Sequence, residues 1–140
     1  MRNAIGRSRG GLSTKVNLIV DALGLPVAFV ITEGQSHDIK SAPALVAMAE
    51  PRRLLADKAF DANSFRAELH QRGCDAVIPS KSNRVPQIPH DKELYKARSE
   101  IECTFSLLKQ ARRFATRYEK TLRNYAAVVA IGCALLWLRI

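Results

Sequence analysis

The chain has 140 residues, 47% of them hydrophobic, which is long and apolar enough for one globular domain with a buried core. A formal net charge of +9 favours a nucleic-acid partner, because each phosphate neutralised by Lys or Arg releases counterions; the alternative is that the charge serves solubility alone. The scattered Cys74, Cys103 and Cys133 form no CxxC or CxxH pair, which excludes a disulfide framework and a structural zinc site and favours a reducing compartment such as the cytoplasm.

Residues 1–11 are basic and glycine-rich, with little that a core would bury. They predict a linker or arm ahead of a domain formed by residues 12–140. The arm either contacts phosphates or is a solvated terminus. It does not resemble a signal peptide, because its arginines are followed by glycines rather than by an apolar run.

Residues 15–20 and 27–32 are two β-branched, apolar runs separated by the turn-rich residues 21–26. This arrangement predicts a β-hairpin. Asp21 falls in the connection, where aspartate commonly initiates a turn, so we interpret it as a turn residue rather than a catalytic one.

Residues 33–38 end the second strand and lead into a predicted helix that runs through Glu50. Asp38 or Ser41 is its expected cap, and Pro43 suits a first turn better than a helix interior. His37 stands next to a carboxylate in sequence. A locally bonded residue at the strand end explains it better than a catalytic or metal-binding role.

Residues 53–57 form a short apolar run that ends in Asp57, and a helix follows from near Asp61. A strand, loop and helix in this order indicate an α/β sheet. Ligands of such sheets meet the carboxyl ends of strands, which makes Asp57 the best-placed acid of the first half. The alternative, left open here, is that Asp57 caps the following helix. Asp61 or Asn63 is the expected cap of that helix, and Asp61 is interpreted as a cap rather than a catalytic residue.

Gly73 ends that helix, and residues 73–79 predict another short strand. Residues 80–90 are polar and interrupted by prolines, so we expect an irregular surface loop. Lys81 and Arg84 either contact a phosphate backbone there or belong to a solvated loop.

Residues 95–109 contain neither Gly nor Pro and are rich in helix formers, which predicts one long helix continuing beyond Lys109. At about 100° per residue, four polar side chains fall within an arc of about 60° on one face: Tyr95, Arg98, Glu102 and Lys109. Glu100 points to nearly the opposite side. One carboxylate is thereby flanked by two cations and a phenol.

Beyond this helix lies a basic tract with two aromatic residues, Phe114 and Tyr118. The tract suits phosphate contacts and base stacking, and the alternative is a solvated helix face. Its cations are Arg112, Arg113, Arg117, Lys120 and Arg123.

The last predicted helix, residues 122–139, is apolar on nearly every side and should pack across the sheet or against a partner. The apolar run 125–138 is shorter than the roughly 20 residues of a membrane-spanning helix, so we expect a buried helix and no membrane partner.

Two carboxylates from distant parts of the chain, Asp57 and Glu102, stand in basic surroundings. Mg²⁺ and Mn²⁺ take oxygen ligands from a few carboxylates and complete their shells with water and phosphate. Such ions promote phosphoryl transfer. The residues therefore suggest a divalent-metal site, although sequence order alone does not bring the two carboxylates together.

The spacing in the long helix resembles a known signature. Two, three and six residues separate its successive members, Tyr95, Arg98, Glu102 and Lys109. This spacing is similar to that around the final glutamate of the DDE transposases of bacterial insertion sequences, whose catalytic domain has an RNase H-like fold. The stretch LLADKAFDAN, residues 54–63, resembles the block with the second catalytic aspartate, and RRFATRYEK, residues 112–120, resembles the basic continuation.

The resemblance implies that Asp57 and Glu102 are the second and third metal-binding carboxylates, with Mg²⁺ or Mn²⁺ as cofactor. It implies that Tyr95, Arg98 and Lys109 hold the transposon-end DNA. From the basic tract, we expect Arg112, Arg113 and Arg117 to contribute further phosphate contacts. The expected reaction is hydrolysis of the strand at the transposon end and transfer of the freed 3′-hydroxyl to target DNA by a multimer.

In the family, the first catalytic aspartate precedes the segment GRSRGG, residues 6–11, and no residue of this chain is assigned to it. We therefore expect an RNase H-like mixed sheet flanked by helices but lacking its first strand, marginally stable alone and prone to associate. Two functions remain open. One is the C-terminal catalytic portion of a transposase that associates with itself or with an upstream transposase segment. The other is an inactive remnant or DNA-binding partner.

Overall fold

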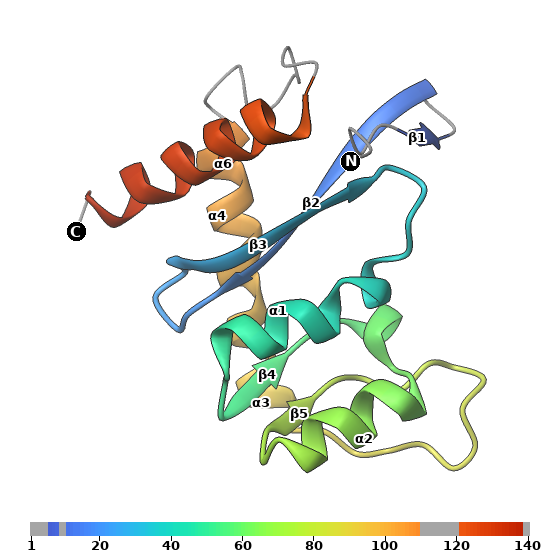
Figure 1. Ribbon diagram of the computed structural model, residues 1–140. Coiled ribbons are helices and arrows are strands. Elements are labelled where there is room, and N and C mark those ends of the chain that lie inside the picture. Colours follow the sequence, from blue (N-terminus) through green and yellow to red (C-terminus); the bar gives the residue numbers. More distant parts are fainter. Residues whose placement is uncertain (1–5, 9–10, 110–120, 139–140) are drawn as a thin grey trace. The chain divides into compact units, whose positions relative to one another are not determined.

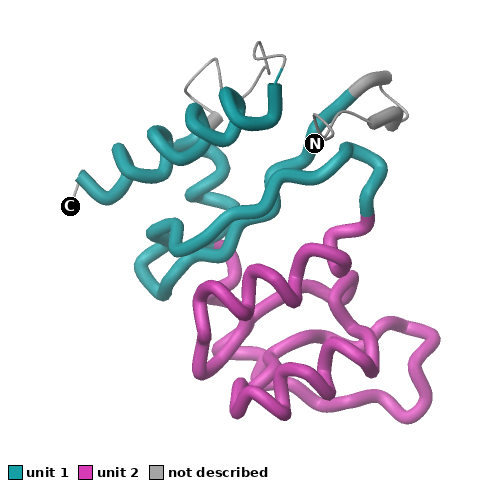
Figure 2. The backbone as a smooth tube through the Cα atoms, viewed as in Figure 1, with its two compact units in different colours: residues 1–36, 100–140 teal, residues 37–99 magenta. Residues whose placement is uncertain are grey.

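The computed structural model describes residues 6–8, 11–109 and 121–138 (Figure 1). The chain divides into two compact units, which Figure 2 colours separately. Unit 1 consists of residues 1–36 and 100–140, and unit 2 consists of residues 37–99. The chain therefore leaves unit 1 after its first strands and returns to it at residue 100.

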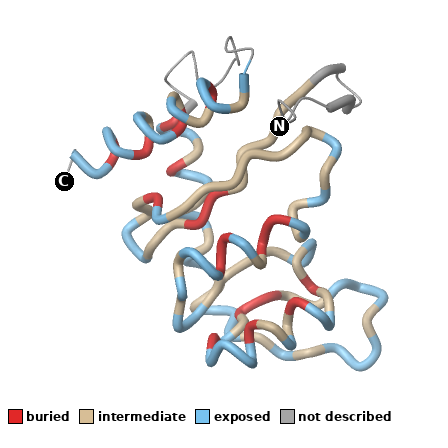
Figure 3. The backbone as a smooth tube through the Cα atoms, in the orientation of Figure 1, coloured by how far each residue is buried: buried red, intermediate tan, exposed pale blue. Residues whose placement is uncertain are grey.

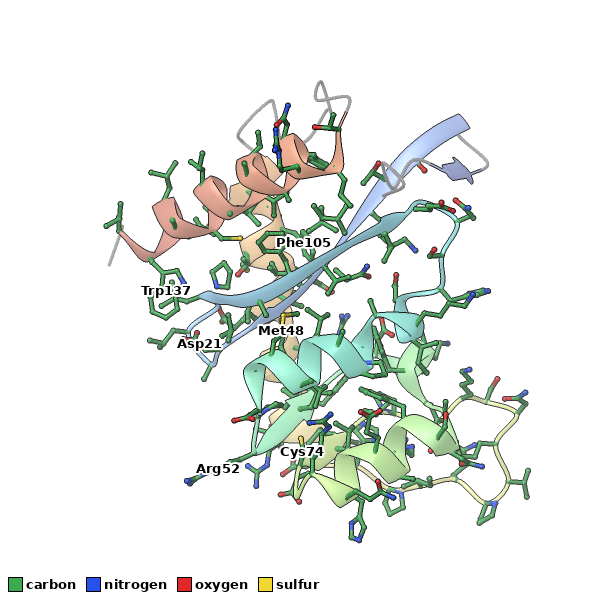
Figure 4. The ribbon with its side chains drawn as sticks, viewed as in Figure 1. Asp21, Met48, Arg52, Cys74, Phe105 and Trp137 are labelled. Carbon is green, nitrogen blue, oxygen red and sulfur yellow. The ribbon has the colours of Figure 1, made fainter. Side chains whose placement is uncertain are left out.

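Unit 1 contains an antiparallel sheet with the strand order β1–β2–β3. Its strands are β1 (Gly6–Ser8), β2 (Gly11–Val20) and β3 (Pro26–Glu33). The predicted hairpin is confirmed, and β-branched pairs such as Val16 and Ile31 lie opposite one another in it. Asp21 Oδ1 accepts hydrogen bonds from the backbone N–H groups of Leu23 and Leu25, both at 2.9 Å. This confirms its predicted place in the turn, which Figure 4 labels.

Two helices pack against the sheet of unit 1, α4 (Ser99–Lys109) and α6 (Leu122–Trp137). Leu18 of β2, Leu108 of α4 and Val129 of α6 belong to one buried cluster, part of the red segments of unit 1 in Figure 3. The Trp137 Nε1–H group donates a hydrogen bond of 2.7 Å to the carbonyl oxygen of Pro26 at the start of β3. The prediction that the last helix packs on the sheet is therefore confirmed, but the expectation of a buried helix is wrong: only one face of α6 is buried, and Ile131 and Leu135 on the rest of the helix are exposed.

The prediction of one regular α-helix over residues 95–109 is wrong in its first part. The structure has α3 (Lys92–Tyr95), a 3₁₀-helix η3 (Lys96–Arg98) and then α4. Ser99 Oγ donates a hydrogen bond to the Lys96 carbonyl oxygen at 3.2 Å, a local bond with which serine competes with regular helix. Because a 3₁₀-turn has fewer residues per turn, the predicted single face does not extend from Tyr95 to Lys109.

Unit 2 is built around two short parallel strands, β4 (Arg53–Leu55) and β5 (Asp75–Val77). Its helices are η1 (Asp38–Lys40), α1 (Ala42–Ala49), η2 (Lys58–Phe60), α2 (Asn63–Gln71), α3 and η3. Val46 of α1, Leu69 of α2 and Ile78 after β5 are each at most 2% exposed and form its core with neighbouring apolar residues.

Most predicted elements of unit 2 are confirmed. Pro43 lies in the first turn of α1, and Ser41 is its N-cap residue, although the Ser41 hydroxyl bonds to the Asp38 carbonyl oxygen instead of a helix N–H group. Gly73 follows α2 with φ of +71°, a left-handed conformation that favours glycine. Residues 80–90 form an irregular loop, as predicted.

The described residues thus form a mixed α/β structure with two small sheets, which confirms the predicted class at that level. The parallel pair β4–β5 places the residues after both strands at one edge, and this edge carries Asp57. None of the helices described is long and apolar enough to cross a membrane.

Candidate active site

Asp57 lies just beyond β4, at the carboxyl end of the parallel pair β4–β5. Its Oδ1 accepts a hydrogen bond of 2.9 Å from the backbone N–H of Ala59, so Asp57 is the N-cap residue of η2. The sequence left open whether Asp57 caps the helix predicted from near Asp61; Asp57 caps the short η2 instead, and the N-cap residue of that helix, α2, is Ala62. Because the cap uses one carboxylate oxygen, Oδ2 remains for a metal ion, and the metal-binding role stays a prediction compatible with the cap.

Asp61, interpreted from the sequence as a helix cap, does not cap α2. The N-cap residue of α2 is Ala62, and no side chain caps the helix there. Asp61 Oδ1 instead accepts a hydrogen bond from Arg66 Nε at 2.7 Å. Its Oδ2 accepts from Arg84 Nε at 2.8 Å and from the Lys81 backbone N–H at 2.7 Å.

These donors stabilise the ionised form of Asp61. The side chain is 0% exposed, and burial alone would raise its pKa. Hydrogen bonds from Arg84, from the Lys81 backbone and from Arg66 outweigh burial, and the net effect lowers the pKa of the Asp61 carboxyl far below its ordinary value of 3.8. Asp61 is therefore a carboxylate throughout the physiological pH range.

The Asp61 network is connected to the strand end that carries Asp57. Phe60 N–H donates to the Asp57 carbonyl oxygen at 3.0 Å, and Asp61 N–H donates to that of Lys58 at 3.1 Å. On the other side, Arg66 Nη2 donates to the carbonyl oxygen of Ile78, just after β5, at 2.8 Å. The carboxyl ends of both strands are thus tied to one buried carboxylate.

Tyr95 and Arg98 contact each other around η3. The Arg98 Cζ atom lies 5.8 Å from the centroid of the Tyr95 ring, within the range of a cation–π interaction. The ring of His90 meets that of Tyr95 edge to face, with centroids 5.5 Å apart. The structure therefore brings these two predicted DNA-binding residues together and adds His90, which the sequence did not single out.

Glu102 and Glu100 have different surroundings in unit 1. Glu102 is exposed in the first turn of α4. The Glu100 carboxylate lies near the β2–β3 turn, since a Cβ placed on Gly24 would be 3.3 Å from Glu100 Oε2. The Thr104 hydroxyl donates a hydrogen bond to the Gly24 carbonyl oxygen and ties α4 to the same turn. Glu102 remains the glutamate predicted for the site.

The donor atoms of the predicted site suit a hard divalent cation. Asp57 in unit 2 and Glu102 in unit 1 both offer carboxylate oxygens, which Mg²⁺ and Mn²⁺ prefer. Among the residues that the structure describes, no group of three His, Cys, Asp or Glu side chains is assembled. The chemistry of the two side chains therefore fits the metal, and their meeting in one site stays a prediction.

Several predicted residues lie outside what the structure describes. Lys109 is the last residue of α4, and its side chain is beyond the described part. The predicted DNA-binding residues Arg112, Arg113 and Arg117 fall in the segment 110–120, also outside it. Their roles stay predictions.

Sequence reasoning missed Arg66, for which only a weak signal was present. Asp61 precedes α2 and Arg66 lies in that helix, so the two charges are near each other in sequence, but not at the three- or four-residue spacing of a helical ion pair. It also offered two roles for Arg84, a phosphate contact or a solvated loop residue. The structure gives Arg84 a third role as a partner of Asp61, with its side chain 18% exposed. His37 is exposed at the start of η1, and its side chain makes no capping bond.

Comparisons with known proteins agree with these features. The family model described as the transposase DDE domain matches residues 3–137. A Brucella ovis protein named "Putative transposase for insertion sequence element IS6501" is 39% identical over 133 residues, covering 91% of this chain and 100% of the relative.

A Burkholderia cepacia protein named "Putative transposase for insertion sequence element IS402" is 27% identical over 146 residues, covering 96% of this chain and 66% of the relative. No solved structure matches the chain. The family model spans nearly all of the residues, including those of the signature on which the resemblance rests. The chain therefore belongs to the DDE transposases of insertion sequences.

Proposed function

We propose that this chain is the C-terminal catalytic portion of a DDE transposase, which cleaves DNA strands at transposon ends and transfers them to target DNA in a metal-dependent reaction. The observation that carries the proposal is the position of Asp57 at the carboxyl end of a parallel strand pair, with one carboxylate oxygen left for a metal ion. Ligands of α/β sheets bind at this edge.

The proposed fold is an RNase H-like mixed sheet formed largely by residues 12–140, preceded by a basic arm. The antiparallel strands β1–β3 and the parallel pair β4–β5 are the strand types that such a mixed sheet requires. The aspartate that would complete the three carboxylates is not assigned to a residue of this chain. Association with an upstream transposase segment would supply it, and further copies of the chain would form the multimer.

Each predicted site residue has a proposed role. Asp57 Oδ2 and the Glu102 carboxylate would hold Mg²⁺ or Mn²⁺, which when bound supplies Lewis-acid chemistry for phosphoryl transfer. Tyr95 and Arg98, held together by their cation–π contact, position a DNA phosphate near the site. Lys109 and the arginines of the basic tract, Arg112, Arg113 and Arg117, neutralise neighbouring phosphates.

The test is nicking of a transposon-end duplex in Mg²⁺ or Mn²⁺ by the chain, alone and together with the upstream transposase segment. We expect Asp57→Asn and Glu102→Gln each to abolish nicking in the preparation that is active. Glu100→Gln is the matched control, because Glu100 lies against the β2–β3 turn, and it should retain nicking.

Three outcomes separate the possibilities. Equal nicking by Glu102→Gln and the unaltered chain would refute the carboxylate assignment. Loss of nicking in Glu100→Gln but not in Glu102→Gln would move the assignment to Glu100. DNA binding without nicking in either preparation would favour the alternative, an inactive DNA-binding partner.

A further inference from the structure

A hollow of about 310 Å³ opens on unit 2 where the loop 80–90 meets the start of α2. Its lining is polar except for Val85, and it contains the carboxylate already described. The lining residues are Asp61, Asn63, Lys81, Asn83, Arg84 and Val85. Because these residues belong to one unit, the hollow is defined independently of the predicted metal site.

The charge balance of the hollow is positive. The buried carboxylate of Asp61 is paired with two guanidinium groups, those of Arg66 and Arg84. One positive charge is therefore left over from this group of three, and the exposed Lys81 adds another. Asp61 accepts three hydrogen bonds from protein donors, so both of its oxygens are occupied, and a cation would gain little from them.

The donors around the hollow are held in position. Arg84 donates through Nε to Asp61 and through Nη1 to Asn63 Oδ1 at 2.7 Å. Since Asn63 accepts through its oxygen, its amide nitrogen is left to donate elsewhere. The loop is closed by Gln87 Nε2, which donates to the carbonyl oxygens of Lys81 at 2.9 Å and Arg84 at 2.6 Å.

A second pair of bonds fixes the base of the loop. The backbone N–H of Ile88 donates to Ser80 Oγ at 2.8 Å, and Ser80 Oγ lies 3.1 Å from the Ile88 carbonyl oxygen. A loop held at both its tip and its base loses little conformational entropy when it binds a ligand. The hydrogen bonds therefore fix the loop backbone and the Arg84 side chain, and the hollow has excess positive charge.

We propose that this hollow binds a phosphate group of the DNA backbone, with Lys81, the Arg84 guanidinium and the amides of Asn63 and Asn83 as donors. The inference rests on the proposed function, since it makes the loop 80–90 part of the surface that holds the transposase's DNA. Arginine and asparagine donors suit the several oxygens of a phosphate, and a charged lysine contributes without fixed geometry. Asp61 acts through Arg84 and is a positioning residue.

The experiment measures binding of a fluorescent transposon-end duplex by the full chain without metal, as anisotropy over a series of salt concentrations. Lys81→Gln should weaken binding several-fold and lower the slope of log affinity against log salt by about one. Arg52→Gln is the matched control, because it removes one positive charge from an exposed side chain before β4, at the opposite end of the strand pair from the loop (Figure 4). Its slope should change little, and Lys81→Arg should restore binding.

The result that overturns the proposal is an equal loss of affinity and slope in Lys81→Gln and Arg52→Gln, or no binding by the unaltered chain. The outcome is separable from that of the nicking test. If the chain nicks DNA but shows no effect specific to Lys81, the proposed function stands and the phosphate site is refuted. If Lys81→Gln specifically loses DNA affinity in a chain that never nicks, the phosphate site stands and the enzymatic function is refuted.

Discussion

Unit 1 and unit 2 each bury an apolar core, but they use polar groups differently. In unit 1 the buried Thr104 donates a neutral hydrogen bond to the Gly24 carbonyl, and Trp137 donates another to Pro26. In unit 2 the buried Asp61 is an ion held by two arginines. The contribution of a buried ion depends on its charge and on all of its partners, whereas a neutral bond is independent of pH. The two units should therefore respond differently to mutation and to acid.

The cysteines allow the two units to be followed separately. Cys133 in unit 1 is 8% exposed and Cys74 in unit 2 is 5% exposed, while Cys103 is exposed. Burial raises the pKa of both buried thiols, and nearby Asp75 adds to the effect at Cys74, so both react slowly in the folded protein. In a Cys103→Ser background, thiol labelling across a urea series, read by mass spectrometry, reports the opening of each unit.

The largest expected effect is that of Asp61→Ala, which leaves two partly buried guanidinium groups without their carboxylate. Removing one partner of a buried ion pair costs roughly 3–5 kcal/mol. The labelling of Cys74 should therefore begin at much lower urea, with little change for Cys133. Glu93→Ala, the control, breaks an exposed ion pair with Lys96, which is worth about 0–1 kcal/mol. A similar shift at both cysteines would contradict the contrast between the units.

Acid should reproduce part of this effect without mutation. The pKa of Asp61 is lower in the folded chain than in the unfolded chain, where it has its ordinary value of 3.8. The Asp61 carboxylate therefore stabilises the fold fully above pH 3.8. Below that pH the unfolded chain binds a proton first, and the stabilisation is lost as the pH falls. Hydrogen exchange of α2 should therefore accelerate relative to α6 as the pH falls below about 4, after correction for intrinsic rates. In Asp61→Asn this difference between the helices should become smaller. An unchanged difference would mean that other groups set the acid response.

Local patterns predicted the parts of the fold that depend on local chemistry. The hairpin followed from two β-branched runs and a turn, and the end of α2 followed from Gly73, whose left-handed backbone suits glycine. The break at residues 96–98 was not predictable, because each residue there has ordinary helix propensity and the competing bond comes from Ser99.

The candidate site, like the fold, was predictable only where it depends on local sequence. Asp57 could be placed at a strand end because the apolar run before it is short and contiguous. The partners of Asp61 could not be predicted, since Arg84 lies 23 positions away in a loop without periodicity. Pairing across such a distance depends on how the loop folds back over α2, which only tertiary structure supplies.

The smallest expected effect tests unit 1. Trp137→Phe removes the 2.7 Å hydrogen bond to the Pro26 carbonyl while keeping an aromatic ring at the end of α6. The loss of one neutral hydrogen bond should destabilise unit 1 by about 1 kcal/mol, so Cys133 should label at slightly lower urea and Cys74 should not change. Leu138→Ala is the control, because this neighbouring side chain is 79% exposed and should contribute little. An equal shift of Cys74 and Cys133 in Trp137→Phe would mean that the two units open together. In that case the two units would differ in their buried polar groups but would not differ in how they unfold.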